Sequence, residues 1–245
     1  MATLCWRGSH FLLEVDFMKR LIQIFLIFIL AGCACPTDLD DDGKVIRPTV
    51  YCNVSFVSAA PDDRNLQVKT EFRTIVEELI YKADEYPYVR TEASKTTLKI
   101  LSGEDEMLYQ NTMMLHEKEY YTLFVHGFNS ALDVLIMNDP LGAMSNDNAY
   151  YRCVNLSADS PELLLRIVGV GQENYLLEYK EAGEIIETRG REYDIQVIET
   201  ARDTILYSLD DVEFQAGYFY NIMIRGYYSV FSHMRLECKI IGNKI

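Results

Sequence analysis

The sequence predicts an all-β protein in which two tandem antiparallel, immunoglobulin-like β-sandwich domains follow a signal peptide and a short acidic tether. Two observations predict the sandwiches. Apolar and polar residues alternate with a period of two along many short runs, as in strands with one buried face. The second half of the chain also repeats the first, which indicates two copies of one domain. A third observation, an apolar segment near the first residues, predicts the signal peptide.

The signal segment comes first along the chain. Lys19-Arg20 precedes the apolar run 21–29, which is too short to span a bilayer. The next residues, Leu30-Ala31-Gly32-Cys33, resemble the lipobox of bacterial lipoproteins. The resemblance implies a lipoprotein signal peptide that is cleaved between Gly32 and Cys33, with acyl chains such as palmitate added at the Cys33 thiol. A plain signal peptide or a buried strand is the alternative interpretation.

The predicted signal region covers residues 1–32. Glu14 and Asp16 lie before the basic pair, where a signal peptide carries no acidic residues, so we expect translation to begin at Met18 rather than Met1. Residues 1–32 hold three basic and two acidic residues, and their removal changes the formal net charge from −14 to −14 − 1 = −15.

This acidity excludes two classes of binding. Nucleic acid needs a basic surface, because its phosphates repel a strongly negative protein. Attraction to anionic lipid is excluded for the same reason, so the acyl chains would have to hold the protein at a membrane. The 49% hydrophobic content is ample for a folded core, and nothing after residue 32 is apolar for long enough to span a bilayer.

Residues 33–48 are predicted to form a lipidated acidic tether. The run 38–43 has the Asp-x-Asp-x-Asp-Gly pattern that opens an EF-hand calcium loop. Thr49 occupies the twelfth position of that loop, where calcium needs a bidentate Glu. A solvated segment kept extended by like charges is therefore the favoured interpretation, and no metal site is assigned.

Four segments recur in the same order at nearly one spacing. They are 57–66 on 154–163 (154 − 57 = 97), 79–82 on 177–180 (177 − 79 = 98), 98–100 on 195–197 (195 − 98 = 97) and 121–127 on 220–226 (220 − 121 = 99). We therefore predict two homologous sandwiches, repeat 1 over residues 49–144 and repeat 2 over residues 145–245. Turn-forming residues at 139–148 suggest a linker between them.

Alternation predicts which side chains face each core. Tyr121, Leu123 and Val125 share one strand face, as do Tyr220, Ile222 and Ile224 in the second copy. One segment is ambiguous, because apolar residues of 72–80 also fit a helical stripe. Its counterpart at 175–179 reads as a strand, so we predict strands in both copies.

Several segments resemble the family called domain of unknown function 4397. Residues 151–161 are similar to its opening strand and Asp/Pro turn, 86–89 to its next strand, and 125–127 with 135–140 to its C-terminal part. The resemblance extends from about residue 50 to 245 as two copies. It implies a β-sandwich on secreted or lipid-anchored bacterial proteins, without an established activity or a family active site.

His126 is the residue most suggestive of an enzyme. His-Gly after an apolar strand resembles the oxyanion loop of some α/β-hydrolases, but the Gly-x-Ser-x-Gly elbow that such enzymes require does not occur. The repeat places Arg225 opposite His126, which favours a structural position. No catalytic residue is assigned.

The cysteines and tyrosines are assigned mainly to the core. Cys52, Cys153 and Cys238 fall on inward faces and are expected to be small buried residues, although a Cys153–Cys238 disulfide is possible in an exported chain. The 17 tyrosines include adjacent pairs near strand ends. One member of each pair should point inward and the other should lie on the rim, where it could serve recognition.

These observations predict a lipid-anchored protein of the cell envelope, at the outer membrane on its periplasmic side or at the cell surface, with a non-catalytic binding or structural role. The expected partners are the membrane, through lipid on Cys33, and an envelope protein or glycan. No cofactor, metal or nucleic acid is expected, and no ligand-binding residue is assigned. The alternative is an envelope hydrolase of an unrecognised type.

Overall fold

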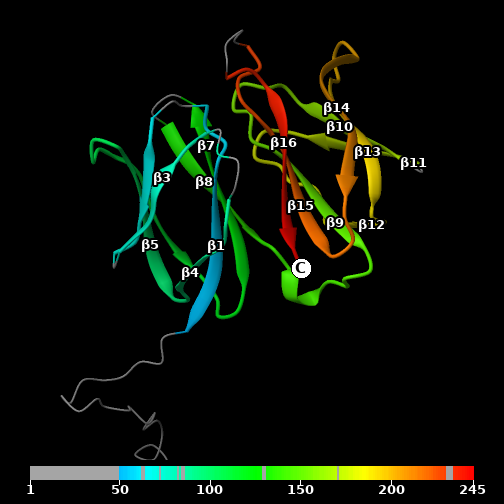
Figure 1. The fold of residues 1–245 in the computed structure, drawn as a ribbon. Helices are drawn as coiled ribbons and strands as arrows, with labels where there is room; N and C mark the ends of the chain where they lie inside the picture. Colours follow the sequence, from blue (N-terminus) through cyan, green and yellow to red (C-terminus); the bar gives the residue numbers. More distant parts are fainter. Residues whose placement is uncertain are drawn as a thin grey trace, which may run out of the picture. The chain divides into compact units, whose positions relative to one another are not determined.

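A computed structural model describes residues 50–245 except 62–63, 72, 82, 84–85, 129–130, 170 and 230–233. Within these residues the fold consists of strands and one short 3-10 helix, η1 (Figure 1). The elements of repeat 1 are β1 (Tyr51–Ser58), β2 (Leu66–Lys69), β3 (Thr74–Leu79), β4 (Val89–Glu92), β5 (Lys95–Ser102), β6 (Met107–Met114), β7 (Tyr120–Phe128) and β8 (Ala131–Asn138). Then come η1 (Leu141–Ala143), β9 (Ala149–Asn155), β10 (Leu163–Gly169), β11 (Gly171–Leu177), β12 (Ile186–Thr188), β13 (Arg191–Glu199), β14 (Thr204–Phe214), β15 (Tyr218–Arg225) and β16 (Glu237–Lys244). The predicted fold class is confirmed.

Each repeat contains two four-stranded sheets with the same connectivity. In repeat 1 the strand orders are β4-β1-β7-β8 and β3-β2-β5-β6, and in repeat 2 they are β12-β9-β15-β16 and β11-β10-β13-β14. Each first sheet has one parallel pair, β1 with β7 and β9 with β15, beside its antiparallel ladders. The strands β1 to β8 therefore correspond in order to β9 to β16.

The strand registers confirm the internal repeat. Val54 pairs with Tyr121 in repeat 1, and Tyr151 pairs with Tyr220 in repeat 2, which gives 151 − 54 = 97 and 220 − 121 = 99. Leu66 pairs with Leu79, and Leu163 pairs with Leu177, which gives 163 − 66 = 97 and 177 − 79 = 98. The spacings that align the sequence are thus the spacings that align the ladders.

Alternation also assigned the core faces correctly. Tyr121, Leu123 and Val125 belong to the hydrophobic core of repeat 1. Tyr220, Ile222 and Ile224 occupy the same positions in the core of repeat 2. The ambiguous segment forms strand β3 beside β2, with Leu79 buried and Glu78 exposed. Backbone pairing to β2 therefore overrides the helical stripe.

A third apolar cluster joins the two repeats. Its buried members come from both: Val57, Ala59, Tyr86, Phe124 and Met137 from repeat 1, and Val154, Leu156, Met223 and Ile241 from repeat 2. Several members are counterparts, for example Val57 with Val154 (154 − 57 = 97) and Phe124 with Met223 (223 − 124 = 99). The contact is therefore made by corresponding faces of the two copies.

This contact explains why some strands are buried on both faces. Every residue of β9 is buried, and so are seven of the eight residues of β15. Tyr150 and Tyr151 are consequently both buried, although alternation predicted that one of them would lie on the rim. Tyr150 packs with Leu141 and Phe219, outside the sandwich interior. The sheet face that alternation assigns to solvent is here a second packed surface.

The three described cysteines are free and buried. Cys153 on β9 lies opposite Ile222, and Cys238 on β16 lies opposite Ile224, so strand β15 separates them. Strands two apart lie about 10 Å from each other, beyond the roughly 7 Å between Cα atoms that a disulfide allows. The possible Cys153–Cys238 disulfide is therefore absent, and these thiols act as core residues.

The predicted signal region, the Gly32–Cys33 cleavage site and the acidic tether lie outside the described residues. Within the described residues, no helix is long and apolar enough to cross a membrane. Residues 49–245 form one compact unit. The segment expected to be a linker begins with Asp139, whose side chain is fully buried, so its first residue belongs to the packed interface.

Candidate functional site

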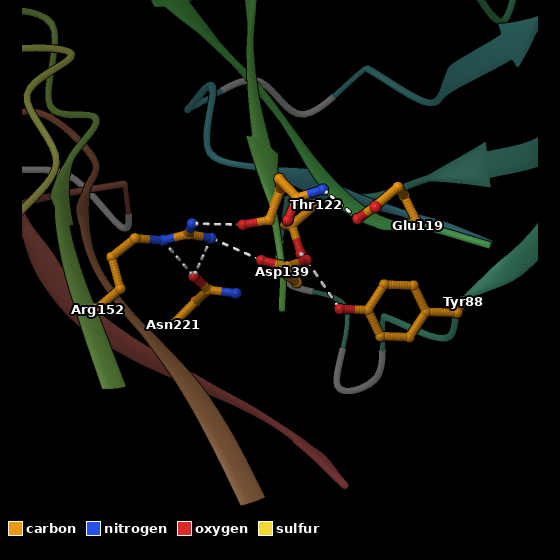
Figure 2. A network of polar contacts seen from close by, with 7 residues as sticks. Tyr88, Glu119, Thr122, Asp139, Arg152 and Asn221 are labelled. Carbon is orange, nitrogen blue, oxygen red and sulfur yellow. Dashed lines mark hydrogen bonds and ion pairs between the residues drawn. The ribbon is translucent and has the colours of Figure 1, made fainter. Parts of the chain in front are cut away.

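Burial excludes water from the contact between the repeats, so polar groups that face it are expected to pair with one another. Most do, although Asn221 Nδ2 and the Tyr81 hydroxyl are buried without a hydrogen-bond partner among the described residues. One set of hydrogen-bonded side chains at this contact, which we call the junction network, consists of Tyr88, Thr122, Asp139, Arg152 and Asn221 (Figure 2). Asp139 follows β8, Thr122 lies on β7, Arg152 on β9 and Asn221 on β15. Residues of both repeats thus meet in one buried cluster.

Arg152 and Asp139 form the ion pair at the centre of the junction network. Arg152 Nη2 lies 2.6 Å from Asp139 Oδ1, and the two side chains are 8% and 0% exposed. Asp139 Oδ2 accepts hydrogen bonds from Thr122 Oγ1 at 2.5 Å and from the Tyr88 hydroxyl at 2.8 Å. Both carboxylate oxygens are therefore satisfied.

The guanidinium of Arg152 is also held on its other sides. Its Nη1 donates to the Asn138 carbonyl at 3.0 Å, and its Nε and Nη2 donate to Asn221 Oδ1 at 3.2 and 2.8 Å. Burial raises the pKa of Asp139 and lowers that of Arg152, while their mutual attraction opposes both shifts. Removing one partner would therefore leave an uncompensated buried charge.

A second cluster surrounds Arg225 at the end of β15. Its guanidinium lies over the ring of Tyr81, 4.4 Å from the ring centroid. It donates to the carbonyls of Ser58 and Tyr81 and to the Tyr86 hydroxyl, all in repeat 1. Its Nη2 lies 2.7 Å from Glu237 Oε1. Arg225 is thus a structural residue that ties β15 to the first repeat.

His126, the residue most suggestive of catalysis, occupies the position in repeat 1 that corresponds to Arg225 (225 − 126 = 99). Its Nδ1 lies 2.7 Å from the hydroxyl of Tyr179 in repeat 2, and Tyr179 is the counterpart of Tyr81 (179 − 81 = 98). Beside it, Lys180 Nζ lies 2.6 Å from Asp133 Oδ2. Both copies therefore direct one nitrogenous side chain to a tyrosine of the other repeat.

The surroundings of His126 do not suit a general base. The side chain is buried, and burial lowers its pKa to about 4 against the weaker attraction of Asp133. The described residues contain no group of three or more His, Cys, Asp or Glu side chains that could hold a metal ion. The geometry of His126 is that of an interface residue.

A groove of about 570 Å³ lies between β14 and β16, at an open edge of the second sandwich. Tyr207, Leu209 and Val212 line it from β14. Cys238, Lys239 and Ile240 line it from β16, with Glu237 and Arg225 at its polar end. Tyr207, Leu209 and Val212 pair with inward-facing residues of β13, so the groove exposes the border of the core. The sequence of β16 did not predict the groove. Its apolar residues alternate in the same way whether or not another strand covers the inward face.

The clustered tyrosines that the sequence suggested for recognition divide evenly. Half of them are buried, namely Tyr86, Tyr121, Tyr150 and Tyr151, and half are half-buried, namely Tyr88, Tyr120, Tyr227 and Tyr228. The Tyr151 and Tyr175 hydroxyls both hydrogen bond Glu173 Oε2 at the edge strand β11. Tyr207 is also half-buried, and it borders the groove.

The family resemblance is confirmed by comparison with known proteins. Residues 52–166 match the model of the family described as domain of unknown function (DUF4397). The match begins in β1 and ends in β10, so it covers repeat 1 and the first strands of repeat 2. The predicted second copy of the family domain extends beyond it, over residues 167–245. No curated protein matches this chain.

Two solved structures show distant likeness. One is the C-terminal domain of AlgF from P. aeruginosa, with 16% sequence identity, 38% of this chain and 100% of that chain covered, and a TM-score of 0.27. The other is CBMbc (family CBM26) from Eubacterium rectale Amy13K in complex with maltoheptaose, with 11% identity, 80% and 97% covered, and a TM-score of 0.24. Both TM-scores are below 0.5, so neither likeness bears on the function of this chain.

Proposed function

We propose that this chain is a lipid-anchored protein of the cell envelope whose two sandwiches form a non-catalytic binding or structural module. Lipid on Cys33 would hold it at the outer membrane, and an envelope protein or glycan would be its partner. The proposal of a lipid anchor rests on the run Leu30-Ala31-Gly32-Cys33, which directly follows a basic pair and a short apolar segment.

The non-catalytic role is supported by how the polar side chains are used. His126, Arg152 and Arg225 all have partners across the contact between the repeats. These contacts, together with the shared apolar cluster, hold the sandwiches as one body. A rigid body that presents loops and sheet edges suits recognition better than chemistry, which needs a nucleophile or base with access to substrate.

Replacement of Cys33 tests the anchor directly. We expect Cys33→Ser to abolish incorporation of labelled palmitate and to leave the signal region attached, because the acylated thiol is absent. Cys35→Ser is the matched control and should be labelled and cleaved normally. Normal labelling of Cys33→Ser would contradict the anchor.

Protease treatment of intact cells tests the location. Digestion of residues 33–245 on intact cells would indicate the cell surface, and digestion only after the outer membrane is opened would indicate the periplasm. Resistance until the inner membrane is lysed would contradict an envelope location.

A substrate screen tests the absence of catalysis. The purified chain should not hydrolyse ester, peptide or glycoside probes. An activity that disappears in a folded His126→Ala variant would overturn the non-catalytic role.

A further inference from the structure

Exposed sheet edges are places where another chain can add a strand, and folded proteins usually protect them. Among the described strands, eight lie at sheet edges: β3, β4, β6, β8, β11, β12, β14 and β16. β4 and β12 are short, with four and three residues. β3, β6 and β14 have irregular registers. β11 directs Glu173 inward, opposite Ile167. Each of these features disfavours the pairing of another strand with that edge.

β16 has none of these protections. Its register with β15 runs through eight consecutive pairs without a shift, from Arg225–Glu237 to Tyr218–Lys244. β8 is similarly regular, with eight pairs to β7. β16 is in addition bordered by the groove, where Cys238 and Ile240 meet Leu209 and Val212 of β14. A strand added beside β16 could therefore bury apolar side chains in a space that already exists.

The hydrogen-bond pattern shows which backbone groups of β16 are free for such a strand. The Ile245 N–H donates to the Gly217 carbonyl at 2.8 Å, which fixes that pair as a hydrogen-bonded one. Hydrogen-bonded pairs alternate along an antiparallel ladder. Residues 237, 239, 241 and 243 therefore bond β15, and the N–H and C=O groups of Cys238, Ile240, Gly242 and Lys244 point to the open edge.

Charge indicates the kind of segment that would bind there. β14 carries exposed Asp210, Asp211 and Glu213 and no basic residue. The charged residues that line the groove itself are the paired Arg225 and Glu237, together with Lys239 of β16. Repeat 2 as a whole has ten basic and sixteen acidic residues over 145–245, a formal charge of 10 − 16 = −6. The net negative charge of repeat 2 attracts basic segments at long range. It also opposes a second copy of the chain, because each copy has a net charge of −14.

We propose that β16 and the adjoining groove bind an extended, basic segment of a partner protein by strand addition, with apolar side chains at alternate positions entering the groove. Main-chain hydrogen bonds to Cys238, Ile240 and Gly242 would supply affinity, and the groove would select the alternate side chains. This proposal rests on the binding role above and names the class of partner.

Amide hydrogen exchange on the full chain in mild detergent tests the mode of binding. The probe is a synthetic nine-residue peptide of alternating lysine and valine with blocked ends. We expect the peptide to slow exchange at Cys238, Ile240 and Gly242 and to leave Lys239 and Ile241, which already bond β15, unchanged. No slowing with peptide at millimolar concentration would overturn the proposal. Slowing without peptide that grows with protein concentration would also overturn it, because a second copy would then be the occupant.

Paired variants separate main-chain addition from side-chain burial. Ile240→Pro removes the edge-facing N–H, whereas Ile240→Ala keeps it and only shortens the side chain. The Pro variant should bind the peptide about tenfold more weakly than the Ala variant, the effect of one main-chain hydrogen bond. Ile136→Pro on β8, at the corresponding register position, should bind as the unchanged chain does.

Equal affinity of the two Ile240 variants, or loss of binding in Ile136→Pro, would contradict the proposal. Circular dichroism establishes that each variant is folded, and if Ile240→Pro does not fold, the exchange pattern of the unchanged chain decides alone. Palmitate labelling of Cys33 is independent of this edge, so failure of strand addition is distinguishable from failure of the anchor.

Discussion

Single polar residues at the contact between the repeats have large effects because they are buried. The Arg152–Asp139 pair is nearly inaccessible to solvent, whereas the Lys180–Asp133 pair has side chains that are 44% and 45% exposed. Exposed pairs contribute little to stability, while half of a buried pair is costly to leave alone. The two pairs therefore form a natural comparison within one molecule.

Asp139→Asn should destabilise the fold by about 3–5 kcal/mol, because it leaves the Arg152 guanidinium buried without its counter-charge. Asp133→Asn is the control and should cost less than about 1 kcal/mol. Urea unfolding measures both free energies. A loss below about 1 kcal/mol for Asp139→Asn would contradict the importance of the junction network.

The fold should also lose stability in acid through His126. Its pKa in the folded chain is about 4, against an ordinary value of 6.5, so the unfolded chain binds a proton first. This contribution to stability is complete above pH 6.5 and is lost as the pH falls toward 4, by about 2–3 kcal/mol at pH 4.5. Urea unfolding at pH 7 and at pH 4.5 measures this loss of stability, for the unchanged chain and for His126→Gln. An equal acid sensitivity of both would show that another group is responsible.

At the scale of elements, both copies end their seventh strand with the same backbone device. Gly127, the last residue but one of β7, has φ +137°, and Gly226, directly after β15, has φ +90°; the two are counterparts (226 − 127 = 99). A Cβ at Gly127 would lie 2.1 Å from the Ala131 carbonyl oxygen, and one at Gly226 would lie 2.5 Å from that of Arg235. Only glycine fits this approach of two backbones.

Gly226→Ala should therefore destabilise the chain by at least about 2 kcal/mol, from both the strained φ and the steric overlap. Gly142→Ala is the control, because nothing lies within 4 Å of a Cβ there and its φ is ordinary. Thermal unfolding followed by circular dichroism compares the two variants. Similar melting temperatures would contradict the steric requirement at Gly226.

At the scale of the whole molecule, the two sandwiches share a core. Phe124 of repeat 1 and Met223 of repeat 2 are both 0% exposed within the cluster that joins them. Separation of the repeats would expose this apolar surface together with both guanidinium clusters, at a large cost in free energy. The repeats should then stabilise each other.

We expect residues 49–245 to unfold in a single cooperative transition. Calorimetric and van't Hoff enthalpies should agree, and Phe124→Ala, which opens a cavity at the shared cluster, should lower the stability of both repeats by about 3–5 kcal/mol. Hydrogen exchange in β5 and in β13 provides a probe of each repeat. Two resolved transitions, or an effect confined to β5, would contradict the shared core.

The sequence by itself determined the all-β class, the repeat spacing and the inward faces of the strands that contain Leu123 and Ile222. Period-two alternation is local, and the copies compare directly along the chain, as Leu123 and Ile222 illustrate. Only the tertiary structure showed which residues the outward faces of these strands contact. Arg225 bonds the Ser58 carbonyl, 167 residues away, and His126 meets Tyr179, 53 residues away. Unbroken apolar runs such as Leu123-Phe124-Val125 and Ile222-Met223-Ile224 indicate burial on both faces, but they do not identify the surface that covers the second face. The partners of these faces, and the open edge of β16, exist only once the strands are placed in space.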